Sequence, residues 1–379
     1  MRIRFLGCWL SALTLAFCVA LPGCTKKAAV ADIPPDDRFA KSLDEMIDYT
    51  ANRRLTIKDH AAWQIIHGAE AFGKDFLIDA DGKTVKAVEY ATNGGPMRGW
   101  NLRPTEHGVV APVEPGAETG GMGHSDQWLG YLSQCGIKLT DPLIVGGKNY
   151  TINALLTNAQ WEINDDPDYD GTWTLMAFIS YPDDLKLDAT WKNKFGEEWS
   201  IERLVAKESR KNNEGIYAEA CGGSHCLYSL ALAVNRYKQS IKDDKEKKGK
   251  PLPEPWKTAD DRVQRAIHDA RSNQNADGTI SANSFLRASS TPDVAQQIRT
   301  TGHVLEFLCV ALDDKEFREP WVTRAAASLT KNFEYTKVIS MECGALYHAA
   351  HGLMLYRERR FGPRTPNVPD QPVPVAEKT

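Results

Sequence analysis

The sequence lacks a marked excess of charge of either sign. Its 46 lysines and arginines nearly balance its 50 aspartates and glutamates, so the formal net charge is -4. A nucleic-acid partner usually demands a strongly basic face, and we therefore expect no nucleic-acid partner. Hydrophobic residues make up 42% of the chain and charged residues 25%, which is typical of a globular protein.

Long apolar runs are also scarce, and the one at the N-terminus is short. Arg2 and Arg4 precede an apolar stretch over residues 5–20. That stretch has the length of a signal-peptide core and is too short for a comfortable membrane span. It ends in the sequence LPGC, whose last residue is Cys24. This ending resembles the lipobox of bacterial lipoproteins.

The lipobox resemblance implies that residues 1–23 are a signal peptide and that the thiol of Cys24 carries a diacylglycerol. Two or three acyl chains anchor a protein stably, whereas one is marginal. We therefore expect a lipid-anchored protein outside the cytoplasm, in the periplasm or on the cell surface, with the membrane as a partner. Residues 24–37 are small, polar and contain proline, and they are predicted to form a tether.

The remainder of the chain is dominated by helical periodicity. Four segments share one design, in which a small-residue turn precedes His or Cys and then a long apolar helix. They open at His124, Cys221, His303 and Cys343. A more polar, amphipathic helix precedes each of the last three. Alternating polar and apolar helices predict stacked helical hairpins, with the apolar helices inside.

Two segments depart from the helical pattern. Residues 75–90 alternate apolar and polar side chains around Asp81 and Gly82, which predicts a small β-hairpin. Residues 361–379 include five prolines and few apolar residues, and we expect this tail to be disordered. The folded domain is therefore predicted to span residues 38–360.

A family resemblance rests on the polar helix before the third segment. Residues 265–280 have the sequence RAIHDARSNQNADGTI. A basic residue, Ala266, Gln274 and Gly278 stand at the offsets of the QW motif of squalene and hopene cyclases, with Asp and Ile replacing its aromatic residue and tryptophan. The glutamine can cap groups at the end of a neighbouring helix, and the glycine permits the turn. With the repeated helix starts, the chain resembles the α/α-toroid superfamily of terpenoid cyclases and protein prenyltransferases, most clearly over residues 197–360.

The resemblance implies an all-α fold, an α/α toroid of helical hairpins around a central cavity, here with a small β-hairpin insertion. It also implies that the inner helices start at one common end. That end would gather several residues that open these helices or stand near their openings. They are His124, Cys221, His225, His303, Cys343 and His348, with His303 and His351 at the cavity mouth.

The catalytic motifs of the superfamily are incomplete in this chain. Class II cyclases protonate an alkene with Asp-x-Asp-Asp, but residues 165–171 have the carboxylates in another order and the composition of a turn. Protein prenyltransferases hold zinc with Asp, Cys and His. Here Ser224-His225-Cys226 falls near the Asp-x-Cys pair and His303 near the histidine, but the aspartate is missing. We therefore expect neither terpenoid cyclisation nor prenyl transfer on zinc.

Helical spacing by itself suggests a metal site. Cys221 and His225 are four residues apart, so they share a helix face, and Cys343 and His348 hold the equivalent end of another helix. Four such groups could close a zinc or copper site. Two alternatives remain open for the same residues, namely a Cys221–Cys343 disulfide, and structural histidines with free thiols.

Other titratable residues provide weaker candidates for catalysis. Glu219 and Glu342 precede two apolar helices, where they would serve a glycosidase or lyase or merely favour a helix dipole. His124 and Asp126 offer an acid–base pair, although residues two apart on a helix diverge. A cysteine–histidine nucleophile is disfavoured in an oxidising compartment.

From these features we expect a membrane-anchored binding or scaffolding lipoprotein, whose central cavity takes an unknown ligand or protein partner. The alternative is an (α/α)-barrel enzyme that acts on glycans or lipids, and a third possibility is a degenerate relative of the terpenoid cyclases. The fold does not choose among them, because such barrels host many chemistries.

Overall fold

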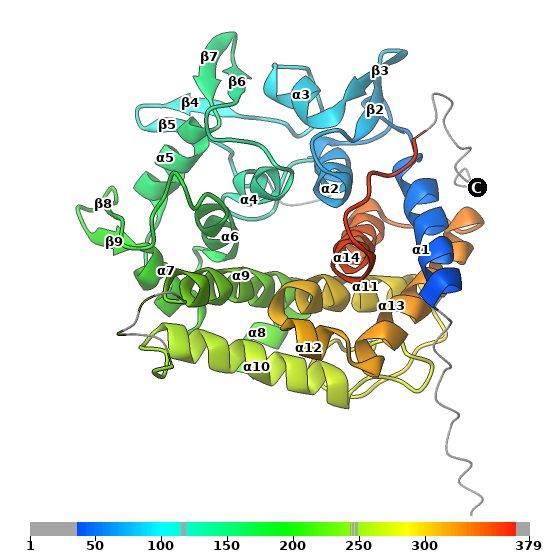
Figure 1. The fold of residues 1–379 in the computed structure, drawn as a ribbon. Helices are drawn as coiled ribbons and strands as arrows, with labels where there is room; N and C mark the ends of the chain where they lie inside the picture. The colour runs from blue at the N-terminus through cyan, green and yellow to red at the C-terminus, as the bar shows by residue number, and fades with distance from the viewer. Residues whose placement is uncertain (1–35, 115–118, 243, 245, 247–248, 369–379) are drawn as a thin grey trace, which may run out of the picture.

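The computed structural model describes residues 36–114, 119–242, 244, 246 and 249–368. Within these residues the molecule consists of fourteen α-helices and four small sheets (Figure 1). The prediction of a mainly helical protein is therefore correct. The predicted signal peptide, Cys24 and most of the predicted tether lie outside the described residues. No described helix combines the length and the hydropathy that crossing a membrane requires.

Six helices pack in a closed cycle at the centre of the molecule. They are α2 (Ala62–Phe72), α4 (Gln127–Gln134), α6 (Thr172–Ser180), α9 (Ser224–Ser240), α11 (Val294–Ala311) and α14 (Cys343–Phe361). Each contacts the next in this order, and α14 contacts α2. These helices are apolar on most sides, and α6 is buried from Thr172 to Ile179. Burial on most sides requires neighbours on most sides, which the cycle provides.

Amphipathic helices cover the cycle from outside. The longer ones are α1 (Asp36–Ala51), α7 (Ile201–Glu208), α10 (Trp256–Ser272) and α13 (Pro320–Phe333). The last three stand where polar helices were predicted, and each buries one apolar stripe. α10 packs on α9, α7 on α6 and α9, and both α1 and α13 pack on α14. Short helices complete the molecule: α3 (Ala87–Thr92), α5 (Asn153–Glu162), α8 (Asn213–Tyr217), α12 (Asp314–Phe317), and the 3-10 turns η1 (Ala220–Gly223) and η2 (Glu334–Lys337).

The segment that carries the family resemblance joins α10 to α13. The amide nitrogen of Gln274 donates to the carbonyl oxygens of Gly278 and Trp321, both at 2.9 Å. Gly278 has φ +89°, and an added Cβ would lie 2.7 Å from the carbonyl oxygen of Arg324. Gln274 and Gly278 therefore fasten the end of one outer helix to the start of the next, as their residue types suggested.

The sheets are short hairpins at the periphery. A hairpin stands where the sequence predicted one, formed by β2 (Leu77–Ala80) and β3 (Lys83–Lys86), and β1 (Leu55–Thr56) pairs with β2 in parallel. Three further hairpins were not predicted, because their strands are only three or four residues long. They are β4 (Arg103–Thr105) with β5 (Gly108–Val110), β6 (Pro142–Val145) with β7 (Lys148–Thr151), and β8 (Thr190–Lys192) with β9 (Glu198–Ser200).

The last described residues lie along α1. The Arg364 guanidinium donates to both carboxylate oxygens of Asp48, at 2.7 and 2.6 Å. The backbone N–H of Asn367 donates to Asp48 at 2.8 Å. The prediction of disorder from residue 361 onward therefore needs correction for residues 362–368, because α1 supplies carboxylates that hold this stretch. Residues 369–379 lie outside the described part of the chain.

Candidate metal centre and central cavity

A cavity of about 510 Å³ opens inside the cycle of six helices. All six helices contribute to its wall. The lining side chains are mostly imidazole and aromatic, and they include Trp63 and His67 of α2, Tyr131 of α4, Trp173 of α6, His225 of α9, His303 of α11 and His348 of α14.

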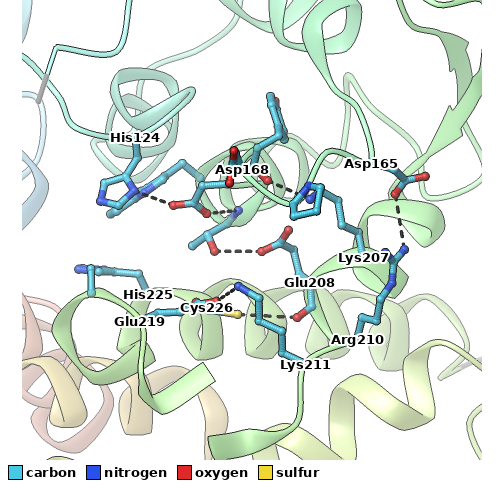
Figure 2. Close-up of a pocket in the computed structure, with 16 residues that line it drawn as sticks. His124, Asp165, Asp168, Lys207, Glu208, Arg210, Lys211, Glu219, His225 and Cys226 are labelled. Carbon is cyan, nitrogen blue, oxygen red and sulfur yellow. Dashed lines mark hydrogen bonds and ion pairs between the residues drawn. The ribbon is translucent and has the colours of Figure 1, made fainter. Parts of the chain in front are cut away.

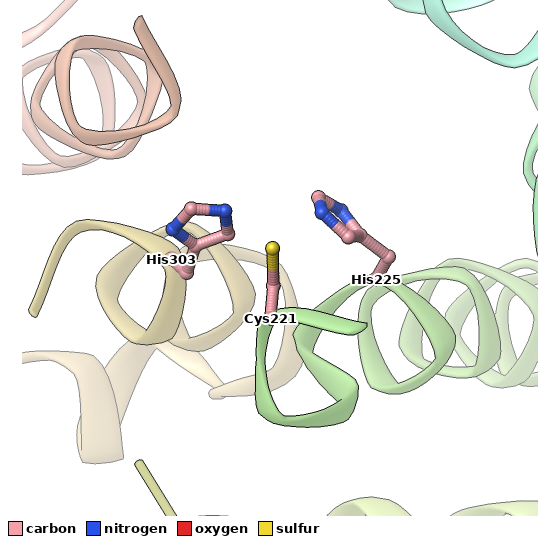
Figure 3. A group of neighbouring side chains, drawn as sticks. All are labelled: Cys221, His225 and His303. Carbon is pink, nitrogen blue, oxygen red and sulfur yellow. The ribbon is translucent and has the colours of Figure 1, made fainter. Parts of the chain in front are cut away.

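A tight turn delivers Cys221 to this cavity. Cys221 lies in η1, just before α9, and has φ +54°, and Gly222 and Gly223 follow with φ +67° and +75°. A Cβ added at Gly223 would lie 2.2 Å from the carbonyl oxygen of Ile216. Only glycine fits such a close approach in a left-handed conformation. The turn points the sulfur of Cys221 between the rings of His225 and His303 (Figure 3).

Cys221, His225 and His303 form a cluster of three potential ligands. One ligand atom from each lies within 4.8 Å of the other two. Nδ1 of His303 donates to the carbonyl oxygen of Arg299 at 2.8 Å, which fixes the ring. The Nε2 of His303 is buried and has no hydrogen-bond partner among the described residues. A histidine that donates one nitrogen to a carbonyl and leaves the other free is typical of a metal ligand.

The electrostatics of the cluster favour a thiolate. Burial opposes ionisation of Cys221, but the nearby charge of His303 and contact with His225 lower its pKa to about 5. Burial likewise opposes protonation of His303, yet the Cys221 thiolate raises the pKa of His303 to about 9. Burial lowers the pKa of His225 to about 4. The cluster thus holds a thiolate, a neutral imidazole and a proton that a bound cation would replace.

Three inner helices repeat a step of three residues, from a histidine that lines the cavity to a titratable residue that does not line it. The pairs are His67–Glu70 on α2, His303–Glu306 on α11 and His348–His351 on α14. Residues three apart lie on the same helix face. The side chains of Glu70, Glu306 and His351 therefore form a second layer of titratable groups next to the histidines that line the cavity.

Glu70, Glu306 and His348 form a second group that can hold a metal, with ligand atoms within 4.8 Å of one another. Nδ1 of His348 lies 3.2 Å from Glu306 Oε2 and 3.5 Å from Glu70 Oε2. Burial, and then repulsion from Glu306, raises the pKa of Glu70 well above its ordinary value. Burial also opposes ionisation of Glu306, but His348 and His351 hold its pKa well below its ordinary value. The pKa values of the two carboxyl groups are therefore shifted in opposite directions.

The His348 ring connects the two groups. Its centroid lies 4.4 Å from that of His303, 4.7 Å from that of His225 and 4.9 Å from that of His67. The Tyr131 hydroxyl lies 3.0 Å from Nε2 of His67 and 3.3 Å from Nε2 of His348. Four histidines from four different helices are thus packed around one point.

The structure brings together most of the residues predicted at helix starts. His124, Cys221, His225, His303 and His348 all line the cavity. One of them, His303, reaches the cavity from a different position in its helix than the sequence predicted. His303 does not open its helix, because α11 begins at Val294.

Cys343 and His351 do not join them. Cys343 is buried, and its sulfur accepts a hydrogen bond from Gln64 Nε2 at 3.7 Å. No disulfide joins any of the described cysteines, so the Cys221–Cys343 disulfide is not formed. His351 is buried beside Glu306, with Nδ1 2.5 Å from Oε1, and not at the mouth. One helical turn explains this difference, because His348 occupies the position on α14 that faces the cavity.

His124 and Asp126, the weak candidates for an acid–base pair, have separate partners. His124 Nδ1 instead lies 2.7 Å from Oδ2 of Asp170. Asp126 accepts hydrogen bonds from Tyr169 at 2.8 Å and Thr174 at 2.6 Å. Asp126 has φ +55° at the start of α4, and its side chain is held by these two hydroxyl groups.

Glu219 and Glu342 also do not converge on one site. Glu342 caps α14 by accepting hydrogen bonds from the backbone N–H groups of Gly344 and Ala345, and it lines the central cavity. Glu219 is ion-paired with Lys211 and lines a different pocket. Glu342 therefore lies at a helix N-terminus, where its charge favours the helix dipole, which was one of its two interpretations.

That second pocket, of about 430 Å³, adjoins the cavity and shares His124, Trp173, Ala220 and His225 with it (Figure 2). Burial, and then the charge of Asp170, raises the pKa of Glu208 in this pocket to about 7. The acidic turn over residues 165–171 forms one wall. Asp165 of this turn forms a 2.6 Å ion pair with Arg203, and the carboxylates of Asp166 and Asp170 also have protein partners.

Sequence reasoning missed His67, Glu70, Tyr131 and Glu306. The repeated His-x-x-Glu spacing in α2 and α11 was the available signal, since it predicts a shared helix face.

Comparison with known proteins gives this chain no family. No family model, no curated protein and no solved structure matches it.

Proposed function

We propose that this chain is a lipid-anchored, extracytoplasmic, zinc-dependent enzyme that holds its metal through Cys221, His225 and His303. The supporting observation is this three-donor cluster at an open cavity, in which the buried Nε2 of His303 has no other partner among the described residues. Three protein ligands with an open position are typical of catalytic zinc, whereas structural zinc has four. A thiolate ligand favours zinc over harder cations.

In this proposal the closed cycle of six helices is the inner ring of an α/α toroid. Contacts between successive inner helices and the return contact from α14 to α2 support this arrangement. The ligand set differs from that of the protein prenyltransferases, because it consists of one cysteine and two histidines and contains no aspartate. We therefore do not propose prenyl transfer.

A zinc ion at this point would act as a Lewis acid and lower the pKa of bound water. The cavity walls would bind the substrate through Trp63 and Trp173 and through the hydroxyl of Tyr131. The hydrogen bond that His124 donates to the Asp170 carboxylate raises the pKa of His124, so that His124 can donate a proton at the junction of the two pockets. Metal-assisted hydrolysis or group transfer on a polar substrate is the reaction class that fits. A glycan suits these walls better than an apolar isoprenoid.

The direct test is metal analysis of the purified chain without residues 1–24. We expect bound zinc in the unmodified protein, and Cys221→Ser and His303→Ala should each remove one equivalent per chain. Cys309→Ala is the matched control, because Cys309 is a buried thiol outside the cluster, and it should leave the zinc content unchanged. A chain without zinc after reconstitution, or equal zinc in all variants, contradicts the proposal.

A second candidate is a thiol enzyme, and the pKa values of Cys221 and His303 favour it. A thiolate paired with an imidazolium is the arrangement of an activated cysteine nucleophile. Alkylation by iodoacetamide at pH 6, followed by peptide mapping, separates the two functions. Zinc should protect Cys221 in a metalloenzyme, with protection lost after chelation. Fast alkylation of Cys221 in protein as purified, with no effect of chelator, supports the thiol enzyme.

A further inference from the structure

We infer that a second divalent cation binds between Glu70, Glu306, His348 and His351, next to the proposed zinc. This second site goes beyond the proposed function and does not depend on it. The four residues are buried, with exposed fractions of 4%, 4%, 2% and 7%. They come from α2, α11 and α14, which are neighbours in the central cycle.

Glu70 provides the observation that points to a ligand. Its Oε2 is buried and has no hydrogen-bond partner within the described part of the chain. It lies 3.5 Å from Nδ1 of His348, and Glu306 Oε2 lies 3.2 Å from the same nitrogen. A buried carboxylate oxygen without a partner is unfavourable. A cation shared with Glu306 would satisfy this oxygen.

The close approach of α11 and α14 builds this site. A Cβ added at Gly302 would lie 2.4 Å from the Cβ of Ala349, and one added at Gly352 would lie 2.9 Å from the carbonyl oxygen of Gly302. Glycine at these positions lets the two helices touch along their backbones. Glu306 then reaches both His348 and His351 on the facing helix.

The donor set indicates the kind of cation. Two carboxylates balance the charge of a divalent ion, and two imidazoles suit Mn²⁺, Fe²⁺ or Zn²⁺. The site contains no thiolate, in contrast to the first cluster. Four protein groups in an enclosed position are typical of a structural metal. The cation would join α2, α11 and α14 and stiffen one wall of the cavity.

The test is the stoichiometry of Zn²⁺ and Co²⁺ binding to metal-free protein, measured by equilibrium dialysis and elemental analysis. We expect two equivalents in the unmodified chain and one in Glu70→Gln. With Co²⁺, the thiolate-to-metal charge-transfer band should persist in Glu70→Gln and vanish in Cys221→Ser, which should retain one equivalent. Glu208→Gln is the matched control, because Glu208 also has a raised pKa but lies outside the group, and it should bind two equivalents.

The possible outcomes separate the two sites. Equal stoichiometry in the unmodified chain and in folded Glu70→Gln overturns the second site, whether or not Cys221→Ser loses a metal. One equivalent that is lost in Glu70→Gln but kept in Cys221→Ser supports the second site and removes the first. If Glu70→Gln does not fold, Glu306→Gln serves in its place, because Glu306 is another of the three residues whose ligand atoms lie within 4.8 Å of one another.

Discussion

At the scale of single residues, backbone conformation determines where the reactive groups lie. Cys221 is the residue that the turn at η1 places among the histidines, and three successive positive φ values make that placement possible. The function proposed for Cys221 therefore depends on Gly222 and Gly223, which are not metal ligands themselves.

The turn can be tested with Gly223→Ala. The added Cβ would meet the Ile216 carbonyl at 2.2 Å, so we expect a loss of roughly 3 kcal/mol or more in the free energy of unfolding and loss of zinc. Gly147→Ala is the control, because Gly147 has the same φ of +75° but no atom within 4 Å of the added Cβ. It should cost only about 1 kcal/mol. Urea unfolding of both variants measures the difference, and equal losses would contradict the close-approach explanation.

Glu208 gives a pH-dependent prediction. Its pKa rises from 4.5 to about 7 on folding, chiefly through burial and then through Asp170. A carboxyl group with a raised pKa is favourable while protonated, so its contribution is present below pH 4.5 and is lost as the pH rises through 7. Glu208→Gln should therefore match the unmodified protein at pH 4.5 and exceed its unfolding free energy at pH 8 by on the order of 2 kcal/mol.

The measurement is urea unfolding of both proteins across this pH range. Glu45→Gln provides the control, because Glu45 is an exposed residue with a surface partner, Lys41 at 3.9 Å. The unfolding free energies of Glu45→Gln and of the unmodified protein should not move apart to a comparable extent as the pH rises. A constant difference between Glu208→Gln and the unmodified protein at all pH values would mean that Glu208 does not titrate differently on folding.

At the scale of helices, three of the inner helices carry titratable residues in two layers. Each of α2, α11 and α14 presents one titratable residue to the cavity and another one turn away, because residues three apart share a face. The distance between facing helices then determines whether the titratable residues of one helix contact those of the next. Between α11 and α14, glycine keeps that spacing short.

Gly302→Ala tests the helix spacing. In an exposed helix, alanine is more favourable than glycine by about 1 kcal/mol. Here the new Cβ would lie 2.4 Å from Ala349 Cβ, and we expect a net loss of roughly 2 kcal/mol from overpacking. Gly215→Ala in α8, whose nearest contact is the Asn212 side chain at 3.3 Å, should be neutral or stabilising. Thermal unfolding measures both, and a stabilised Gly302→Ala would show that the helices can separate at no cost.

At the scale of the whole molecule, the proposed metals bind elements that are distant in sequence. The first cluster joins α11 to the turn before α9, and the second joins α2, α11 and α14. A cation that binds only the folded chain stabilises it by mass action. Metal binding would therefore act on the whole central cycle.

Chelation should lower the melting temperature by roughly 3–8 °C, as expected for a site held near a hundred times its dissociation constant. Re-addition of Zn²⁺ should restore it, and the combined variant Cys221→Ser/Glu70→Gln should show no response to chelator. Calorimetry with and without EDTA is the measurement. A melting temperature that does not respond in the unmodified protein would argue against any bound metal.

Membrane attachment is predicted by the N-terminal sequence alone. Cells that express the full chain should incorporate labelled palmitate into it, and Cys24→Ser should abolish the label. Cys343→Ser is the control, because Cys343 is buried in the folded domain. Label retained in Cys24→Ser, or absent from the unmodified chain, would contradict lipidation at this residue.

The sequence could predict which helices are amphipathic and which are apolar, because the periodicity of polar and apolar residues is a local property. It predicted the outer helices α7, α10 and α13 and the hairpin at β2–β3. It misplaced the start of α11, because Thr301 and Gly302 before His303 have the composition of a turn, whereas the helix runs through them from Val294. It also could not separate His348 from His351, since both lie on a helix that is buried nearly all round.

What the sequence alone determined is the chemistry that is available: histidines, cysteines and carboxylates on apolar helices, with glycines beside them. What only the tertiary structure decided is which of them meet. Cys221 lies beside His225 and His303 and forms no disulfide with Cys343, and Glu70 lies beside Glu306 and His348. The physical reason is that these contacts join helices far apart in the chain, and their distances depend on backbone packing between helices, which no local pattern of residues specifies.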